Sequence, residues 1–239
     1  GNTGAVMAAA ILVLGRIAGV DRPALMTLMP NPQGVTVLLD VGANVDVRAE
    51  HLVQFAIMGS AYASSVLKVT APRVGILSIG EEETKGNELT LSALPLLKRE
   101  SLNFIGNVEG RDVFNGRADV VVCDGFVGNV LLKAGEGLAY AVEEMIRQEV
   151  ARSFPAKVAL GTGLFFLKGL RRRLDYAEYG GAPLLGVSGV VVAAHGSSRA
   201  RAVKNAIRVA MESVQNGLVE TIRAGIARRN AKGVGMVNG

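Results

Sequence analysis

Small polar clusters stand where apolar runs give way to segments with helical spacing. Each combines glycine with side chains that can cap a helix, bind an anion or hold a proton. Because free backbone N–H groups at helix starts bind phosphate-sized groups, several such joints together predict an anion site, although each alone is equally typical of a helix cap. The five clusters are Gly1-Asn2-Thr3-Gly4-Ala5, Asp40-Val41-Gly42-Ala43-Asn44, the loop Gly80 to Glu88, Asp124-Gly125-Phe126-Val127-Gly128-Asn129, and His195-Gly196-Ser197-Ser198.

Lys85 is the cation inside the glutamate-rich loop, and it is the candidate for holding negative charge. The alternative is a solvated loop charge, and the three glutamates are either metal ligands or a solvated face. Cys123 is the single cysteine and ends an apolar run, which is typical of an inert core thiol. With one cysteine and two histidines, no His/Cys zinc cluster can form, and we expect no metal and no cofactor.

Nucleotide-binding and serine-nucleophile motifs are missing from the sequence. No Walker loop occurs, and no G-x-G-x-x-G pattern follows an expected strand. The stretch Gly186-Val187-Ser188-Gly189 lacks the spacer of a serine nucleophile elbow. The chemistry therefore has to come from the polar clusters.

The elements that must position these clusters alternate along the chain. Apolar runs followed by helical periodicity predict an α/β protein with three α/β/α layers around a mostly parallel sheet, in which the carboxyl ends of the strands form the ligand crevice. We expect a core over residues 1–227 and a loose tail over 228–239. Strands are expected at residues 23–29, 34–41, 73–79, 103–108, 118–123 and 184–194, and helices from the start to about 17 and at 49–69, 89–100, 127–153 and 197–227.

Composition supports a folded domain that acts on anions. The 239 residues are 49% hydrophobic and 20% charged, with a net charge of +5, which favours anionic substrates or surfaces and carries no sign of nucleic-acid binding. The longest apolar run, Ala5 to Leu14, is too short to cross a bilayer. A cytoplasmic, reducing compartment is the expectation.

Six ordered motifs resemble one known family. GNTGA, LLDVGAN, GEEETKGNE, VCDGFVGN, DYAEYGGAPLLGV and AAHGSS are similar to the bacterial phosphate acyltransferases. The resemblance implies a homodimer with a fold like that of isopropylmalate dehydrogenase and phosphotransacetylase, which converts long-chain acyl-ACP and inorganic phosphate into acyl phosphate for phospholipid synthesis. Members of the family carry a preceding segment with a DAMGGD-like loop, so the resemblance implies an N-terminally shortened chain.

Phosphate is an ionised nucleophile at neutral pH, so its attack on a thioester needs positioning and charge stabilisation more than an enzyme nucleophile. Lys85 or His195 is expected to stabilise the oxyanion, and protonated His195 to donate to the leaving thiolate. Asp40 and Asp124 are expected to orient the donors, or only to cap the next helix. The expected catalytic residues are Lys85, Asn87 and His195, and the expected phosphate- and substrate-binding residues are Asn2, Thr3, Gly4, Asp40, Asn44, Asp124, Gly125, Asn129, Ser197 and Ser198.

Residues 150–179 interleave apolar and basic side chains, with Phe165 and Phe166 near the run Arg171-Arg172-Arg173. The pattern is typical of a protruding helical hairpin that pairs with a dimer mate and touches an anionic membrane or acyl carrier protein, or else of an ordinary hairpin over the core. Membrane contact would allow delivery of the product to a membrane-bound glycerol-phosphate acyltransferase. Three other functions stay open: a short-chain phosphotransacetylase using coenzyme A, an inactive fragment, and a metal- and NAD-dependent hydroxyacid dehydrogenase of the same fold.

Overall fold

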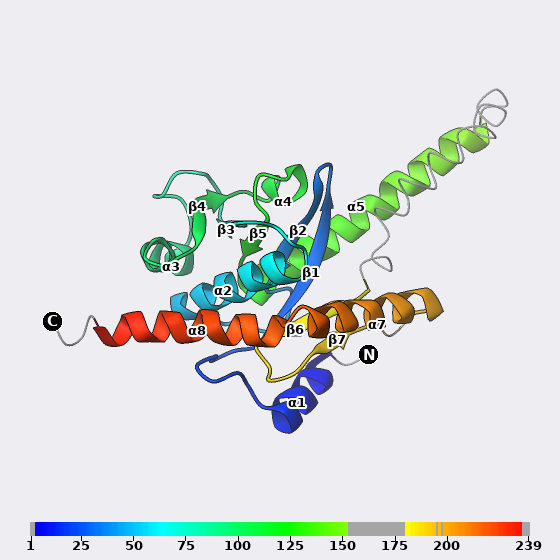
Figure 1. Ribbon diagram of the computed structural model, residues 1–239. Coiled ribbons are helices and arrows are strands. Elements are labelled where there is room, and N and C mark those ends of the chain that lie inside the picture. Colours follow the sequence, from blue (N-terminus) through cyan, green and yellow to red (C-terminus); the bar gives the residue numbers. More distant parts are fainter. Residues whose placement is uncertain (1–2, 153–179, 195, 197, 236–239) are drawn as a thin grey trace.

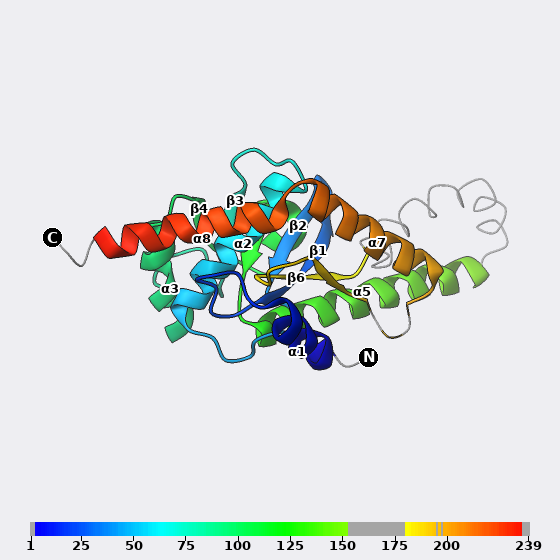
Figure 2. The ribbon, with the colours of Figure 1, turned by 60° about the horizontal axis from the view of Figure 1, so that its bottom comes forward.

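The computed structural model describes residues 3–152, 180–194, 196 and 198–235. These residues form a seven-stranded sheet in the order β4-β3-β5-β2-β1-β6-β7, with helices on both faces (Figures 1 and 2). The strands are β1 Ala24–Asn31, β2 Gly34–Leu39, β3 Arg73–Leu77, β4 Asn103–Val108, β5 Val120–Val122, β6 Ala182–Leu185 and β7 Val191–Ala193. The helices are α1 Thr3–Leu14, α2 Ala49–Ser65, α3 Glu88–Lys98, α4 Asp112–Asn115, α5 Gly125–Arg152, α7 Ala200–Gln215 and α8 Leu218–Gly235.

The parallel section of the sheet places the polar loops. Strands β4, β3, β5 and β2 run in the same direction, and their last residues are in register: Leu39 lies opposite Val122, and Leu77 opposite Val108. The loops that follow these four strands therefore share one edge of the sheet, where open α/β sheets bind ligands. The predicted α/β class with polar groups at strand ends is confirmed.

The other section of the sheet is antiparallel. β1 and β2 form a hairpin, in which Asn31 pairs with Gly34 across the turn. β6 pairs with β1, and β7 with β6, both antiparallel. Antiparallel neighbours need only short connections, whereas each parallel pair needs a crossover, which explains why the helices α2, α3 and α5 accompany the parallel strands.

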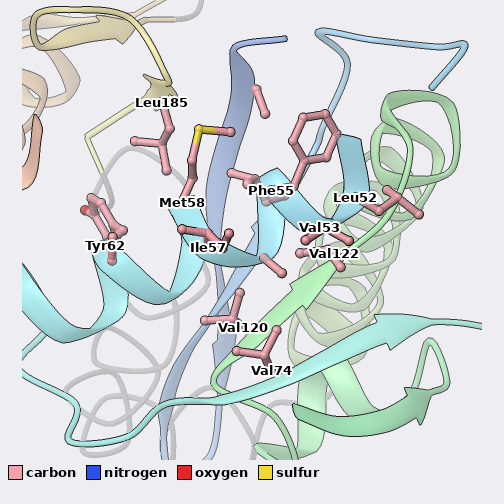
Figure 3. Close-up of a cluster of buried hydrophobic side chains, with 14 of the residues drawn as sticks. Leu52, Val53, Phe55, Ile57, Met58, Tyr62, Val74, Val120, Val122 and Leu185 are labelled. Carbon is pink, nitrogen blue, oxygen red and sulfur yellow. The ribbon is translucent and has the colours of Figure 1, made fainter. Parts of the chain in front are cut away.

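Two apolar cores, one on each face of the sheet, hold the three layers together. On one face α2, α3 and α8 cover the strands, and Phe55 and Met58 of α2 are fully buried with Val120 and Val122 (Figure 3). On the other face α1, α4 and α5 contribute to a second core around Val121. Burying a side chain of this size stabilises the fold by about 1.5–3 kcal/mol, so these layers rather than polar contacts supply the stability.

Three expected elements differ from the structure. The single strand over 184–194 is wrong, because the chain turns after Leu185 and forms two antiparallel strands, β6 and β7. The single helix over 197–227 is wrong, because it breaks at Asn216 and Gly217 into α7 and α8. The first helix ends at Leu14 rather than near residue 17.

The loose tail expected over residues 228–239 is also wrong for residues 228–235, which continue α8. Ile222 and Ile226 anchor the preceding turns of this helix in the core, and within residues 228–235 Arg229 pairs with Glu100 at 3.4 Å. No helix among the described residues has the length and apolar character needed to cross a membrane.

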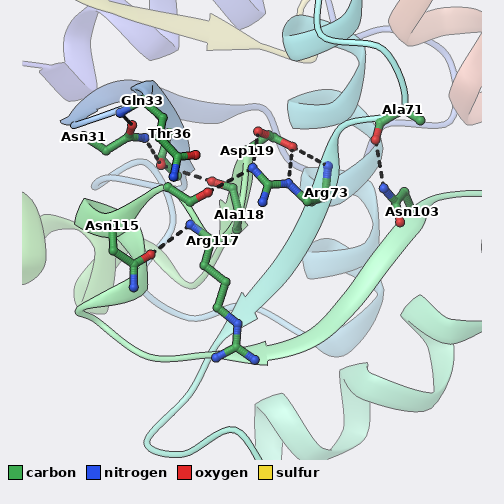
Figure 4. A network of polar contacts seen from close by, with 11 residues as sticks. Asn31, Gln33, Thr36, Ala71, Arg73, Asn103, Asn115, Arg117, Ala118 and Asp119 are labelled. Atoms are coloured by element: carbon green, nitrogen blue, oxygen red, sulfur yellow. Dashed lines mark hydrogen bonds and ion pairs between the residues drawn. The ribbon is translucent and has the colours of Figure 1, made fainter.

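An ion pair joins β3 to the residue before β5 on the far edge of the parallel section (Figure 4). The Arg73 side chain donates to both carboxylate oxygens of Asp119, from Nε at 3.0 Å and from Nη2 at 2.9 Å, and its backbone N–H donates at 2.8 Å. Burial alone would raise the pKa of Asp119, but the hydrogen bonds from Arg73 outweigh it and hold that pKa below its ordinary value.

We expect this pair to give the protein an acid-sensitive contribution to stability. A lowered folded pKa stabilises the fold fully above about pH 4, and the stabilisation is lost as the pH falls through the folded value. Because Arg73 is 41% exposed, the contribution is about 1 kcal/mol at most. Between pH 6 and pH 2.5, urea unfolding should show a smaller loss of unfolding free energy for Asp119→Asn than for the parent. Equal losses in the two proteins would contradict this role.

Candidate functional site

Asp40 lies directly after β2 and is fully buried. Its Oδ1 accepts from the backbone N–H groups of Leu25 and Ala43, both at 3.0 Å, and its Oδ2 accepts from the backbone N and Nδ2 of Asn44 at 2.7 and 2.9 Å. Burial raises the pKa of Asp40, and these hydrogen bonds oppose the rise. Both oxygens already accept two hydrogen bonds, so this carboxylate holds the loop after β2 in shape.

The start of α5 packs directly on that loop. The backbone N–H of Gly125 donates to the carbonyl oxygen of Asn44 at 2.7 Å. Asp124 caps the helix, since its Oδ1 accepts from the N–H of Val127 at 2.9 Å. Asn129, expected to bind phosphate or substrate, lies in the second turn of α5, where it is exposed beside Gly42. The structure thus brings together Asp40, Asn44, Asp124, Gly125 and Asn129 at one joint.

Cys123 belongs to the same joint but offers no nucleophile. It is buried, and its Sγ lies 3.6 Å from the carbonyl oxygen of Asp40. Burial raises the pKa of the Cys123 thiol well above its usual value, which keeps it protonated at neutral pH. The expectation of an inert core thiol is in keeping with this environment.

The loop between β3 and α3 carries Lys85 on the same edge of the sheet. The carbonyl oxygen of Lys85 accepts from Ser78 Oγ and from Asn107 Nδ2, both at 3.1 Å, and its N–H donates to the carbonyl oxygen of Glu82 at 2.9 Å. Its side chain is exposed, and no ion pair engages its ammonium group among the described residues. The fixed backbone removes part of the ordering cost of binding an anion, and the side chain itself must still be ordered, at about 0.5–1.5 kcal/mol.

Two glutamates of this loop are engaged in ion pairs. Glu81 pairs with Arg117 and, at 3.4 Å, with Arg111, and the hydrogen bond from Arg117 lowers the pKa of Glu81. Glu83 pairs with Lys98 of α3. Within the described part of the chain, no group of three or more His, Cys, Asp or Glu side chains is arranged to hold a metal ion.

Asn87 acts as the cap of α3. Its side chain accepts from the N–H of Thr90 at 2.9 Å, while Thr90 Oγ1 accepts from the N–H of Asn87 at 3.0 Å. These reciprocal bonds fix the end of the Lys85 loop and the start of the helix. The side-chain oxygen of Asn87 is therefore occupied locally.

The remaining expected residues lie elsewhere or outside the described part. Gly4 is exposed in the first turn of α1, and Thr3 begins that helix. Ser198 does not cap α7, because the residue before that helix is Arg199. Asn2, His195, Ser197 and residues 153–179 of the hairpin expected over 150–179 lie outside the described residues, and residues 150–152 belong to the end of α5.

Two residues that shape this edge of the sheet, Asn107 and Arg117, are not among the site residues expected from the sequence. Asn107 is a buried amide that follows Phe104 and Ile105 in β4, and a polar residue beside an apolar run of a strand is a visible signal. Arg117 reaches Glu81 across 36 residues of sequence, and no local pattern indicates that pairing.

Comparison with known proteins places this geometry in a family. Residues 1–221 match the family model described as fatty acid synthesis protein. The chain is 59% identical over 235 residues to the phosphate acyltransferase of Pelotomaculum thermopropionicum, an alignment that covers 98% of this chain and 69% of that protein. The chain belongs to the phosphate acyltransferase family. It is also 57% identical to the phosphate acyltransferase of Desulforudis audaxviator, over 100% of this chain and 71% of that one.

Solved structures confirm the fold of this phosphate acyltransferase family member. A phosphotransacetylase from Streptococcus pyogenes superimposes with a TM-score of 0.56 at 17% identity, over 90% of this chain and 61% of that one. A branched-chain phosphotransacylase from Enterococcus faecalis gives a TM-score of 0.53 at 15% identity, over 89% and 80%. The predicted phosphotransacetylase-like fold is therefore confirmed, and family membership makes the chain an acyltransferase.

Proposed function

We propose that this protein transfers a long-chain acyl group from acyl carrier protein to inorganic phosphate, for use in phospholipid synthesis. The observation that carries the proposal is the 59% identity to a phosphate acyltransferase over nearly the whole chain. The family description as a fatty acid synthesis protein favours a fatty acyl donor. Phosphate and acyl carrier protein are then the substrates, with no cofactor.

The reaction needs no group beyond charge and position. A phosphate oxygen attacks the thioester carbonyl carbon, the C–S bond breaks, and the carrier thiolate leaves and takes up a proton. Lys85 is proposed to hold phosphate or to stabilise the oxyanion, because its ammonium is exposed at the edge where the parallel strands end. Asp40, Asn44 and Asp124 are proposed to position this edge through the contacts described above rather than to touch phosphate.

The donor can be tested by comparing palmitoyl-ACP with acetyl-CoA as substrates in the presence of phosphate. Burying only four of the additional methylene groups, at about 0.8 kcal/mol each, favours the long chain by about 200-fold in kcat/KM. NAD with a hydroxyacid serves as the control for dehydrogenase activity. Equal or higher kcat/KM for acetyl-CoA would reassign the protein as a short-chain phosphotransacetylase.

We further propose that the protein is a cytoplasmic homodimer whose residues 150–179 contact anionic lipid at the inner membrane face. The support is the sequence pattern of that segment, in which Lys157, Lys168 and the run Arg171-Arg172-Arg173 flank phenylalanines and leucines. Co-sedimentation with vesicles containing anionic lipid, weakened by salt, is expected for the parent and not for Phe165→Glu with Phe166→Glu. Equal binding by the double variant would overturn the membrane contact.

A further inference from the structure

A β-bulge interrupts β4 next to the loop that carries Lys85. Val74 of β3 pairs with Phe104, but the next residue, Gly75, pairs with Gly106, so one residue of β4 is skipped. Gly106 has a φ of +90°, a backbone conformation that glycine adopts readily. The bulge therefore adds one residue to β4 in the middle of the strand.

The bulge changes which face of the sheet Asn107 occupies. Paired residues point to the same side, and Asn107 pairs with Ile76, which belongs to the core beneath α2 and α3. Ile105 and Val108 both lie in the opposite core, although they are three residues apart. If β4 kept all its residues but ran as a regular strand without the bulge, strict alternation would place Asn107 on the face of Ile105.

On the face that it occupies, Asn107 holds the Lys85 loop from within. Its side chain is 3% exposed, and its Nδ2 donates to the carbonyl oxygens of Glu82 at 2.8 Å and of Lys85 at 3.1 Å. Both donor hydrogens of one buried amide are thus used on a single loop. The separate Glu81–Arg117 pair holds the beginning of the same loop.

We infer that Asn107 is a positioning residue for the acyl transfer, which acts by fixing the backbone on which Lys85 meets phosphate. The inference rests on the proposed role of Lys85. Asn107 donates to the loop backbone and does not need to touch substrate. Its effect on phosphate should therefore pass through Lys85 and vanish when Lys85 is absent.

A double-mutant cycle tests this route. Asn107→Asp removes both donors and places a carboxylate against two carbonyl oxygens, so we expect KM for phosphate to rise, or kcat to fall, by about 10- to 100-fold, with KM for the acyl donor unchanged. In a Lys85→Ala background the same substitution should change KM for phosphate or kcat by less than about two-fold. Asn107→Ala serves as the second variant if the aspartate prevents folding.

The matched control is Asn103→Asp, at the other end of the same strand. Asn103 Nδ2 also donates to a loop carbonyl, that of Ala71 at 2.9 Å, but at the opposite edge of the sheet (Figure 4). The Asn103→Asp variant should leave KM for phosphate and kcat unchanged. Hydrogen exchange should accelerate at the amides of residues 82–87 in the Asn107 variants and not in the control.

The outcomes separate the inference from the proposed function. One outcome is that Lys85→Ala changes the phosphate kinetics strongly while Asn107→Asp changes them by the same factor in the parent and in Lys85→Ala. That result would overturn the positioning role of Asn107 and leave the role of Lys85 in place. Unchanged hydrogen exchange in the loop would overturn it as well. Normal phosphate kinetics of folded Lys85→Ala would overturn both the role of Lys85 and the inference that depends on it.

Discussion

Replacing Lys85 with alanine is expected to raise KM for phosphate or to lower kcat by about 10- to 1000-fold, the range for losing one charged contact to a substrate or transition state. The cost in stability should be small, because the side chain is exposed and its backbone carries the contacts that shape the loop. Steady-state kinetics with varied phosphate separates the two effects: loss of ground-state binding raises KM, and loss of transition-state stabilisation lowers kcat.

Lys98→Ala is the matched control for charge near this loop. Lys98 is also a partly exposed lysine, but it pairs with Glu83 of the loop, so its charge is engaged within the protein. We expect near-parent kinetics for Lys98→Ala, and partial recovery of activity in Lys85→Arg, which keeps the charge. Parent-like values for a folded Lys85→Ala variant would remove Lys85 from the site.

Replacing Gly128 with alanine is expected to destabilise the protein by about 3 kcal/mol, because α5 begins in contact with the loop after β2. A Cβ on Gly128 would overlap the carbonyl oxygen of Asp40 and lie 2.9 Å from Cys123 Sγ. Backbone atoms cannot yield as a flexible side chain would, so the helix start must move away from Asp40. Urea unfolding measures the free-energy change, and acyl transfer should fall with it.

Gly137→Ala, in the same helix, provides the control. A Cβ at Gly137 meets nothing within 4 Å, and replacing glycine by alanine inside a helix stabilises by up to about 1 kcal/mol. The two substitutions are chemically identical, so changes of opposite sign in the unfolding free energy would show that the contact with Asp40 causes the difference. Destabilisation of similar size at both positions would instead indicate that the close packing of α5 on the loop after β2 is not required.

The alternation of elements was predictable because each parallel strand is a short apolar run followed by helical spacing. β5 and α5 show this directly, since Val120–Val122 are fully buried and α5 begins within two residues of its expected start. The breaks inside apolar or helical stretches were missed. Residues 197–227 divide at Asn216 and Gly217, a pair typical of a turn, and the buried positions step by five residues from Ser213 to Leu218.

At the candidate site, the sequence indicated which joints carry polar groups but not what those groups bind. Asp40 resembles a ligand at a strand end, yet its oxygens are occupied by N–H groups of Leu25, Ala43 and Asn44. Asn107 acts on a loop 22 to 25 residues earlier, through a bulge that alternation rules do not anticipate. Contacts between distant segments decide both cases, and they appear only when the sheet is assembled.

The measurement that tests the account most directly is the stoichiometry of the reaction with palmitoyl-ACP and inorganic phosphate. Direct attack by phosphate predicts no release of carrier thiol without phosphate, and equal amounts of thiol and acyl phosphate with it, the latter separated from acyl-ACP before it is trapped as hydroxamate by hydroxylamine. Lys85→Ala should reduce both products together. Thiol release that does not depend on phosphate, or a covalent acyl-enzyme isolated before phosphate is added, would contradict direct transfer to phosphate at this site.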